Sequence, residues 1–243
     1  MRYERRGIRA QPWFRRAWYV GRALIGNRPA LLPALKHAPG TPADYVVSSD
    51  SDVCIEGFSR SGNGFAVSYF RQFNPRARIA HHVHLPAQLL VARRHGVPRI
   101  LLVRRPRDSV VSSLVAYDGV IGADLLLRGY VAYHRRLLAH LDDIPVCRFE
   151  ELTATPDVLV ERLNERFGTR FDARRLTPAD AAGLMDGMRG SAAARGYPPR
   201  AFSVPAPEKE ELKARWRQAV EGHRLLGHAT AIHETVVRRG SSA

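Results

Sequence analysis

The sequence predicts an α/β protein with three layers, in which helices cover both faces of a central, mostly parallel sheet. Apolar runs of strand length alternate with amphipathic stretches of helix length along most of the chain. Arginine and serine directly follow two of those apolar runs, where ligands of open parallel sheets gather. With 243 residues, 45% of them hydrophobic, the chain is long enough to bury the core of one such domain.

The N-terminal part of the chain is basic and aromatic, and four prolines interrupt it between residues 29 and 42. We expect a short helix over residues 9–25, packed on the edge of the domain; docking of this helix on a membrane surface is the alternative. Residues 1–45 would form a basic helical extension, and residues 46–243 the main domain. The apolar side of the helix would carry Trp13, Phe14, Trp18 and Leu24.

The strands of the main domain are expected where short apolar runs end in basic or glycine-containing turns. The clearest is "PRILLVR", an apolar run between Arg99 and Arg104. The segment "ARIAHHVHLP" is expected to be a short strand that ends in a loop. The other strands expected in this way are residues 52–58 and 144–152, and the two quoted segments are residues 98–104 and 77–86.

The helices are expected from amphipathic periodicity and from residues suited to helix ends. Pro106 suits a first helical turn and Asp108 its positive end, while Gly168 suits a C-terminal cap. Residues 169–206, rich in glycine, proline and alanine, are expected to be irregular. The helices expected are residues 64–72, 86–95, 106–117, 124–141, 156–167 and, as the last, 208–222.

The formal net charge is +15, carried almost wholly by arginine. Such a charge fits anionic partners: phosphates, acidic glycans, a membrane surface or nucleic acid. A basic nucleic-acid-binding protein without catalytic activity would cluster arginine and exposed aromatic residues on one face. Here the arginines are spread along the chain, so we expect no nucleic-acid partner and keep that class as an alternative.

The cysteine content and the hydropathy of the sequence indicate the cellular compartment. Cys54 and Cys147 both lie in apolar, strand-like runs, and two cysteines make no disulfide framework. No apolar run reaches the length of a membrane span, and no apolar signal-peptide core follows the basic N-terminus. We expect a cytoplasmic protein, with peripheral contact at the inner membrane through the N-terminal segment as the alternative.

The first candidate motif is "CIEGFSRSGNGF", which joins a strand to a helix through serines, glycines and Arg60. Such a turn can cradle a phosphate, because the helix start offers unpaired N–H groups and the positive end of the helix dipole. An ordinary strand-to-helix turn would explain the segment about as well. It is not the loop of nucleotide triphosphatases, since the Gly-Lys-Ser/Thr ending is absent.

The second candidate motif, "LLVRRPRDSVVSSL", places Arg104 at the carboxyl end of a strand and Ser112 on the helix that follows. An arginine and a hydroxyl in those positions can hold a second phosphate. A solvated basic loop with a helix cap is an equally good interpretation of this motif alone.

The third candidate motif is "HHVHLP", in which strand alternation would put His82 and His84 on one face. A neutral imidazole near pH 7 can take a proton from an alcohol, so a general base is one interpretation, and a core histidine is another. A metal pair is a third, but no carboxylate or thiol stands nearby to complete a ligand set, and we expect no metal.

Taken in order, the three motifs resemble those of the sulfotransferases that use 3′-phosphoadenosine 5′-phosphosulfate (PAPS). "SRSGNGF" stands where that family has a Pro-Lys-Ser-Gly-Thr-Thr-Trp-like loop, and "VHLP" looks like its Thr-His-Leu-Pro. "RRPRDSVVSS" is similar to its Arg-Asn-Pro-Lys-Asp-Val-Ala-Val-Ser element. "FEELTATP" and "FSVPAPEKEEL" resemble two later stretches, so the resemblance covers about residues 52–221.

The resemblance implies the P-loop NTPase-like sulfotransferase fold and roles for individual residues. His84 would be the catalytic base, and Arg60 would lie near the bridging oxygen of the leaving phosphate. Phe149 would stack on the adenine. The loop around the 5′-phosphate would comprise Arg60, Ser61, Gly62, Asn63, Gly64 and Phe65. The contacts of the 3′-phosphate would come from Arg104 and Ser112, joined by Arg189 and Gly190.

Several residues depart from the family's pattern. Asn63 and Gly64 replace two hydroxyl residues, which puts side-chain bonds to the phosphosulfate in doubt and leaves a fold without activity as one alternative. Phe149 replaces a tyrosine, and His82 a lysine that often accompanies the base. Arg60 replaces a lysine, which exchanges a point donor for a planar fork.

The implied reaction is metal-free, in-line transfer of a sulfuryl group from PAPS to a hydroxyl. The arginines would suit an acidic glycan or an anionic lipid headgroup, and a small molecule is also open, since variable loops build the acceptor pocket. The chief rival is a P-loop kinase-like phosphotransferase. That rival needs a magnesium-binding carboxylate after a strand, for which Glu150 and Glu151 are faint candidates.

Overall fold

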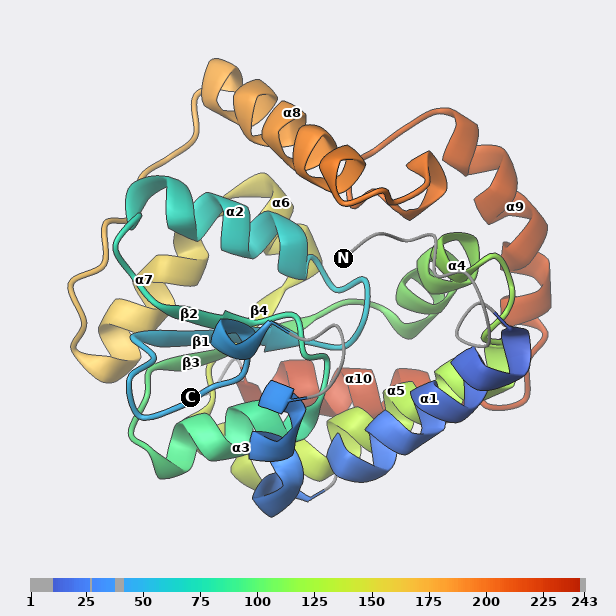
Figure 1. The fold of residues 1–243 in the computed structure, drawn as a ribbon, viewed down its shortest axis with the longest axis horizontal. Coiled ribbons are helices and arrows are strands. Elements are labelled where there is room, and N and C mark those ends of the chain that lie inside the picture. The colour runs from blue at the N-terminus through green and yellow to red at the C-terminus, as the bar shows by residue number, and fades with distance from the viewer. Residues whose placement is uncertain (1–10, 27, 38–41, 241–243) are drawn as a thin grey trace.

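The computed structural model describes residues 11–26, 28–37 and 42–240 (Figure 1). Its centre is one sheet of four strands in the order β2-β1-β3-β4, and every pairing in the described part of the chain is parallel. The predicted α/β class is confirmed, with an all-parallel rather than a mostly parallel sheet. The strands are β1 (Val53–Gly57), β2 (Ile79–His81), β3 (Arg99–Val103) and β4 (Val146–Arg148).

Helices pack on both faces of the sheet, because neighbouring strand residues point to opposite sides. Cys54 and Leu101 belong to one buried cluster, whereas Ile55 and Leu102 belong to the other. On the side of Ile55 lie α2 (Asn63–Phe73), α6 (Phe149–Ala154), α7 (Asp157–Phe167) and α8 (Pro178–Ala194) (Figure 1). On the other side lie α3 (Pro86–Arg94), α4 (Pro106–Tyr117), α5 (Ala123–Leu137) and α10 (Leu226–Gly240).

The N-terminal segment packs against the second of these helical layers. It comprises α1 (Pro12–Gly26), η2 (Pro29–His37) and η3 (Ala43–Tyr45). Leu32 and Leu35 of η2 are buried in the same core as α3 and α5. The predicted helix over residues 9–25 is therefore present from Pro12, and its first residues fall outside the described part of the chain.

The predicted elements agree with the structure wherever the apolar pattern is regular. The helix predicted over residues 106–117 has those bounds, and Gly168 ends α7 in the left-handed conformation with φ of 64°. The helix predicted over 124–141 instead divides into α5 and a 3-10 helix, η4 (Leu138–Asp143).

Three predictions about the later part of the chain are wrong. Residues 149–152 begin α6 rather than extending a strand, because Glu151 accepts a hydrogen bond from the Arg148 backbone N–H at the helix start. The segment predicted to be irregular contains α8, which Thr177 and Asp180 cap reciprocally, and η5 (Pro199–Ala201). The helix predicted to be last, α9 (Glu208–Glu221), is followed by α10.

Helix length and hydropathy also bear on membrane topology. None of the helices among the described residues has both the length and the apolar character needed to cross a bilayer.

Candidate active site at the carboxyl ends of β1 and β3

The candidate site lies where the direction of strand addition reverses. The chain passes from β1 to β2 on one side of β1, and β3 then pairs with the other side of β1. Loops at the carboxyl ends of such adjacent strands diverge and leave a crevice, which is where open α/β sheets bind ligands. The loop after β1 contains Arg60, and the loop after β3 contains Arg104.

The loop between β1 and α2 has a tightly fixed backbone. Arg60 and Gly62 both have left-handed conformations, with φ of 67° and 93°. Ser109 Oγ on α4 donates to Ser59 O at 2.7 Å, and Asn63 Nδ2 donates to Phe58 O at 3.1 Å. These bonds fold the loop back on itself, so that it leads directly into the first turn of α2.

The N-terminus of α2 is uncapped. No side chain within the described part of the chain caps this helix, and the first N–H groups of any helix lack partners within it. The Ser61 hydroxyl is fully buried and has no hydrogen-bond partner among the described residues. Buried hydroxyls are normally paired, so this donor fits a bound phosphate or sulfate oxygen.

The Asn63 side chain makes its hydrogen bonds within the loop. Its Nδ2 is directed to Phe58 O and, at 3.4 Å, to Gly57 O, within the loop itself. Its Oδ1 is buried without a partner among the described residues and can only accept a hydrogen bond. The side chain therefore braces the loop, and its remaining capacity suits a donor rather than an anion.

The Arg60 guanidinium links two of the predicted motifs. Its Nε donates to Ser112 Oγ on α4 at 3.0 Å. Its terminal nitrogens donate to Ser203 Oγ at 3.0 Å, Phe202 O at 3.0 Å and Ala201 O at 3.1 Å. The structure thus brings "SRSGNGF", "RRPRDSVVSS" and "FSVP" into contact through one side chain.

Arg104 lies against the same loop. Its Nη1 donates to Arg60 O at 3.1 Å, and its guanidinium lies 3.9 Å from the ring centroid of Phe149. The position is partly buried, and burial lowers the pKa of Arg104. The two candidate phosphate-binding motifs are therefore adjacent, and the Phe149 ring lies beside Arg104.

His84 has a defined tautomer. Its Nδ1 lies 3.0 Å from Gly57 O, and because a carbonyl oxygen only accepts, Nδ1 carries the proton. The lone pair of the neutral ring is therefore at Nε2. The side chain retains 29% of its exposure, and its backbone is held in the left-handed region at φ of 55°. The arrangement presents a proton acceptor at the same strand end as Arg60.

A buried carboxylate lies behind His84. Glu56 is 0% exposed, and its Oε1 is 3.5 Å from His84 Nδ1. The carboxylate also accepts from the backbone N–H groups of Gly57 at 3.0 Å and Val83 at 2.8 Å. Glu56 was not singled out from the sequence, although an acidic residue inside the apolar run "VCIEGF" was a visible signal.

Of the other histidines of "HHVHLP", His81 is buried and His82 is partly buried beside His84. Burial first, and then the charges of Arg71 and Arg195, lower the pKa of His81 to about 3. Burial likewise lowers the pKa of His82, whose ring centroid is 5.7 Å from that of His84. The described part of the chain contains no cluster of three or more potential metal ligands.

Arg189 and Gly190 lie on α8 rather than against Arg104. Arg189 is exposed and pairs with Asp186 at 2.7 Å, and no described atom lies within 4 Å of a Cβ built on Gly190. The buried cation beside Arg60 is instead Lys209, which donates to Phe202 O at 2.6 Å and Val204 O at 2.8 Å. Burial, with the nearby charge of Arg60, lowers the pKa of Lys209 to about 8.

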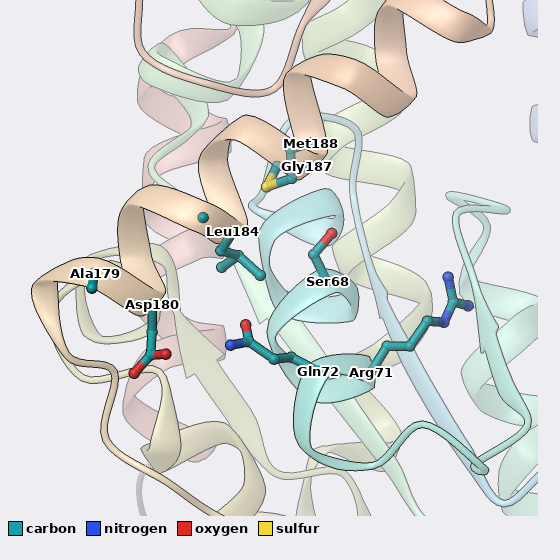
Figure 2. A pocket seen from close by; sticks show the side chains of 9 residues that line it. Ser68, Arg71, Gln72, Ala179, Asp180, Leu184, Gly187 and Met188 are labelled. Carbon is teal, nitrogen blue, oxygen red and sulfur yellow. The ribbon is translucent and has the colours of Figure 1, made fainter.

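A separate cleft of about 530 Å³ runs between α2 and α8 (Figure 2). Leu184 and Met188 of α8 face Ser68 and Gln72 of α2, while Arg71 extends away from α8. The cleft does not include Arg60, Arg104 or His84, so it is distinct from the candidate site.

Comparisons of the chain with protein-family models, with curated proteins and with solved structures find no match.

Proposed function

We propose that this protein transfers a sulfuryl group from PAPS to an acceptor hydroxyl, and that its α/β architecture is the P-loop NTPase-like sulfotransferase fold. One observation carries the proposal. Arg60, Ser112 and Arg104 form one hydrogen-bonded cluster at the β1/β3 switch point, at the strand end where His84 presents its lone pair. This juxtaposition supplies both an anion site and a base.

The anion site offers two kinds of donor. The uncapped N-terminus of α2 and the Ser61 hydroxyl suit the 5′-phosphosulfate, and Arg104 with Ser112 suits the 3′-phosphate. The Phe149 ring beside Arg104 provides a face for adenine stacking. Arg60 contacts Ser112 and Arg104 and precedes Ser61 in the loop, so its charge would act on both phosphates of the leaving bisphosphate.

The chemical step needs one base and one stabilised leaving group. His84 Nε2 accepts the acceptor's hydroxyl proton as that oxygen forms its bond to sulfur. The bond from sulfur to the bridging phosphate oxygen breaks, and its electron pair stays on the bisphosphate. Arg60 and the positive end of α2 stabilise the charge that develops there.

Glu56 gives His84 the orientation this step requires. The Gly57 carbonyl and the Glu56 carboxylate both lie against Nδ1, so the ring is fixed with Nε2 outward. A buried negative charge at 3.5 Å also stabilises the imidazolium that forms when the base takes its proton. We assign Glu56 as a positioning residue for the base.

The kinase-like alternative receives little support from the carboxylates it requires. Glu151 accepts hydrogen bonds from Arg162 at 2.9 Å and from Arg148 at 2.6 Å. Burial alone would raise the pKa of Glu151, but these bonds outweigh it and lower the pKa to about 2. The carboxylate thus stabilises the start of α6, and the Lys-Ser/Thr of a kinase loop is absent from the sequence.

Ligand-dependent unfolding tests the proposal. We expect 3′-phosphoadenosine 5′-phosphate to stabilise the protein without added metal, by about 2.7 kcal/mol at one hundred times its Kd. ATP with magnesium and a short DNA duplex serve as controls. Stabilisation by ATP and magnesium alone would favour the kinase-like alternative, and stabilisation by DNA alone the nucleic-acid-binding one.

A further inference from the structure

Helix α1 presents an apolar stripe to solvent, while Tyr19 and Arg22 face the protein. Trp13, Ala17, Val20 and Leu24 follow one another at helical spacings of four, three and four residues, and all are exposed. Trp13 retains 58% of its exposure and Leu24 66%. A surface helix of a globular protein normally buries such a stripe, so α1 is inverted in this respect.

The contacts on the opposite side of α1 fix this orientation. Tyr19 packs toward α5, where a Cβ on Gly129 would lie 2.5 Å from its hydroxyl. Arg22 Nη2 donates to Val83 O at 2.6 Å, and Gly26 lies against the Leu85 side chain. Rotating the helix to bury its apolar stripe would break these contacts. Figure 1 shows α1 on the outside of the helical layer, away from the sheet.

The charge around the stripe indicates what covers it. From the start of α1 to Ala43 the sequence has five Arg or Lys residues and no Asp or Glu. A second copy of this chain, with its own charge of +15, would meet that surface with like charge. An anionic bilayer attracts it, and tryptophan at the interface and arginine beside it are typical of helices that lie on membranes.

We propose that α1 docks the protein on an anionic membrane surface, with Trp13, Val20 and Leu24 inserted at the headgroup level. The inner side of the helix contacts Val83 and Leu85, which flank His84. Docking therefore places the loop of the candidate base within about one helix diameter of the bilayer. Resting on the proposed function, this position favours a lipid-borne hydroxyl as the acceptor.

Vesicle binding tests the docking independently of catalysis. The full chain is sedimented with vesicles of phosphatidylcholine alone and with vesicles containing phosphatidylglycerol. We expect binding only to the anionic vesicles, weakened by salt. Leu24→Glu and Trp13→Glu should each lower the partition coefficient about tenfold or more, because each removes an inserted apolar side chain. Leu212→Glu, at an exposed leucine on α9 that retains 37% of its exposure, is the control and should leave binding unchanged.

The outcomes separate the possible occupants. Equal binding of the wild type, Leu24→Glu and Leu212→Glu proteins to anionic vesicles would overturn the docking of α1. A wild-type dimer in solution that Leu24→Glu converts to monomer would assign the stripe to a second copy instead. Urea unfolding of each variant beside the wild type shows, without reference to any ligand, that the variants fold. Membrane binding without any stabilisation by 3′-phosphoadenosine 5′-phosphate would refute the proposed function and leave the docking intact.

Discussion

Substituting Gly62 with alanine tests whether the loop after β1 has the conformation that an anion site needs. Gly62 has φ of 93°, and a Cβ there would lie 2.9 Å from Leu152 Cδ2 and 3.1 Å from Phe149 Cδ2. Gly96, which follows α3, is the matched control. It has φ of 67°, and no described atom lies within 4 Å of its Cβ position.

The two substitutions share one cost and differ in another. A left-handed conformation costs an L-residue about 1–2 kcal/mol, and both Gly62→Ala and Gly96→Ala incur it. Only Gly62→Ala also forces apolar neighbours apart, which costs typically about 1–3 kcal/mol. We expect Gly96→Ala to lower the free energy of unfolding by about 1–2 kcal/mol and Gly62→Ala by about 2–5 kcal/mol.

Urea unfolding measures both stabilities, and titration with 3′-phosphoadenosine 5′-phosphate measures binding. The added methyl in Gly62→Ala displaces Phe149, on which Arg104 stacks, so binding should be lost in that variant and kept in Gly96→Ala. Equal losses of stability would show that Phe149 and Leu152 do not pack on the loop. Full affinity in a folded Gly62→Ala protein would refute the placement of the anion site.

The remaining predictions concern the cluster, the base and the buried lysine. Arg104→Ala should weaken 3′,5′-bisphosphate binding far more than adenosine 5′-phosphate binding in calorimetry, and equal loss would assign Arg104 another role. His84→Ala should lower turnover about 100- to 10,000-fold, and Glu56→Gln at least about tenfold, both with bisphosphate affinity kept; retained turnover in folded His84→Ala would exclude it as the base. Burial and Arg60 lower the pKa of Lys209 to about 8. Because a bound anion attracts the charged form of Lys209, bisphosphate affinity should fall as pH rises through 8 and the lysine loses its proton. Unfolding free energy without ligand should instead rise above pH 8, because the unfolded state then binds more protons, and Lys209→Met should remove both trends.

The order of the four strands along the chain was predictable because local patterns carry it. The strands end in basic or glycine-containing turns, and Pro106 and Gly168 mark the ends of two helices that the structure confirms. Helix α8 was missed because its alanines and glycines carry no apolar stripe, although Thr177, Pro178 and Asp180 form a helix start signal. Helix α10 was missed although its buried residues, Ala229, Ile232 and Val236, follow one another at helical spacings of three and four.

The candidate site was only partly predictable because its contacts join distant segments. Local motifs pointed to Arg60, Arg104 and Ser112, yet the bond from Arg60 to Ser112 spans 52 residues of sequence. Lys209 was overlooked because a lysine in "PEKEEL" is typical of a solvated helix start. Only the packing of residues 202–204 beneath Arg60 buries its amine.

Glu56 is the residue of the candidate site whose role was hardest to predict from the sequence. A buried carboxylate must be paired or hydrogen-bonded. The run "VCIEGF" therefore predicts a partner for Glu56, but the sequence does not show which residue it is. The strand register identifies the partner. Ile55 pairs with His81, and the chain beyond β2 then turns through His82 and His84, both in the left-handed conformation. That turn brings the Val83 N–H to Glu56 and His84 Nδ1 to Gly57 O. The partner of a buried acidic residue in a strand can therefore be identified only when the neighbouring strand and the turn that follows it are known.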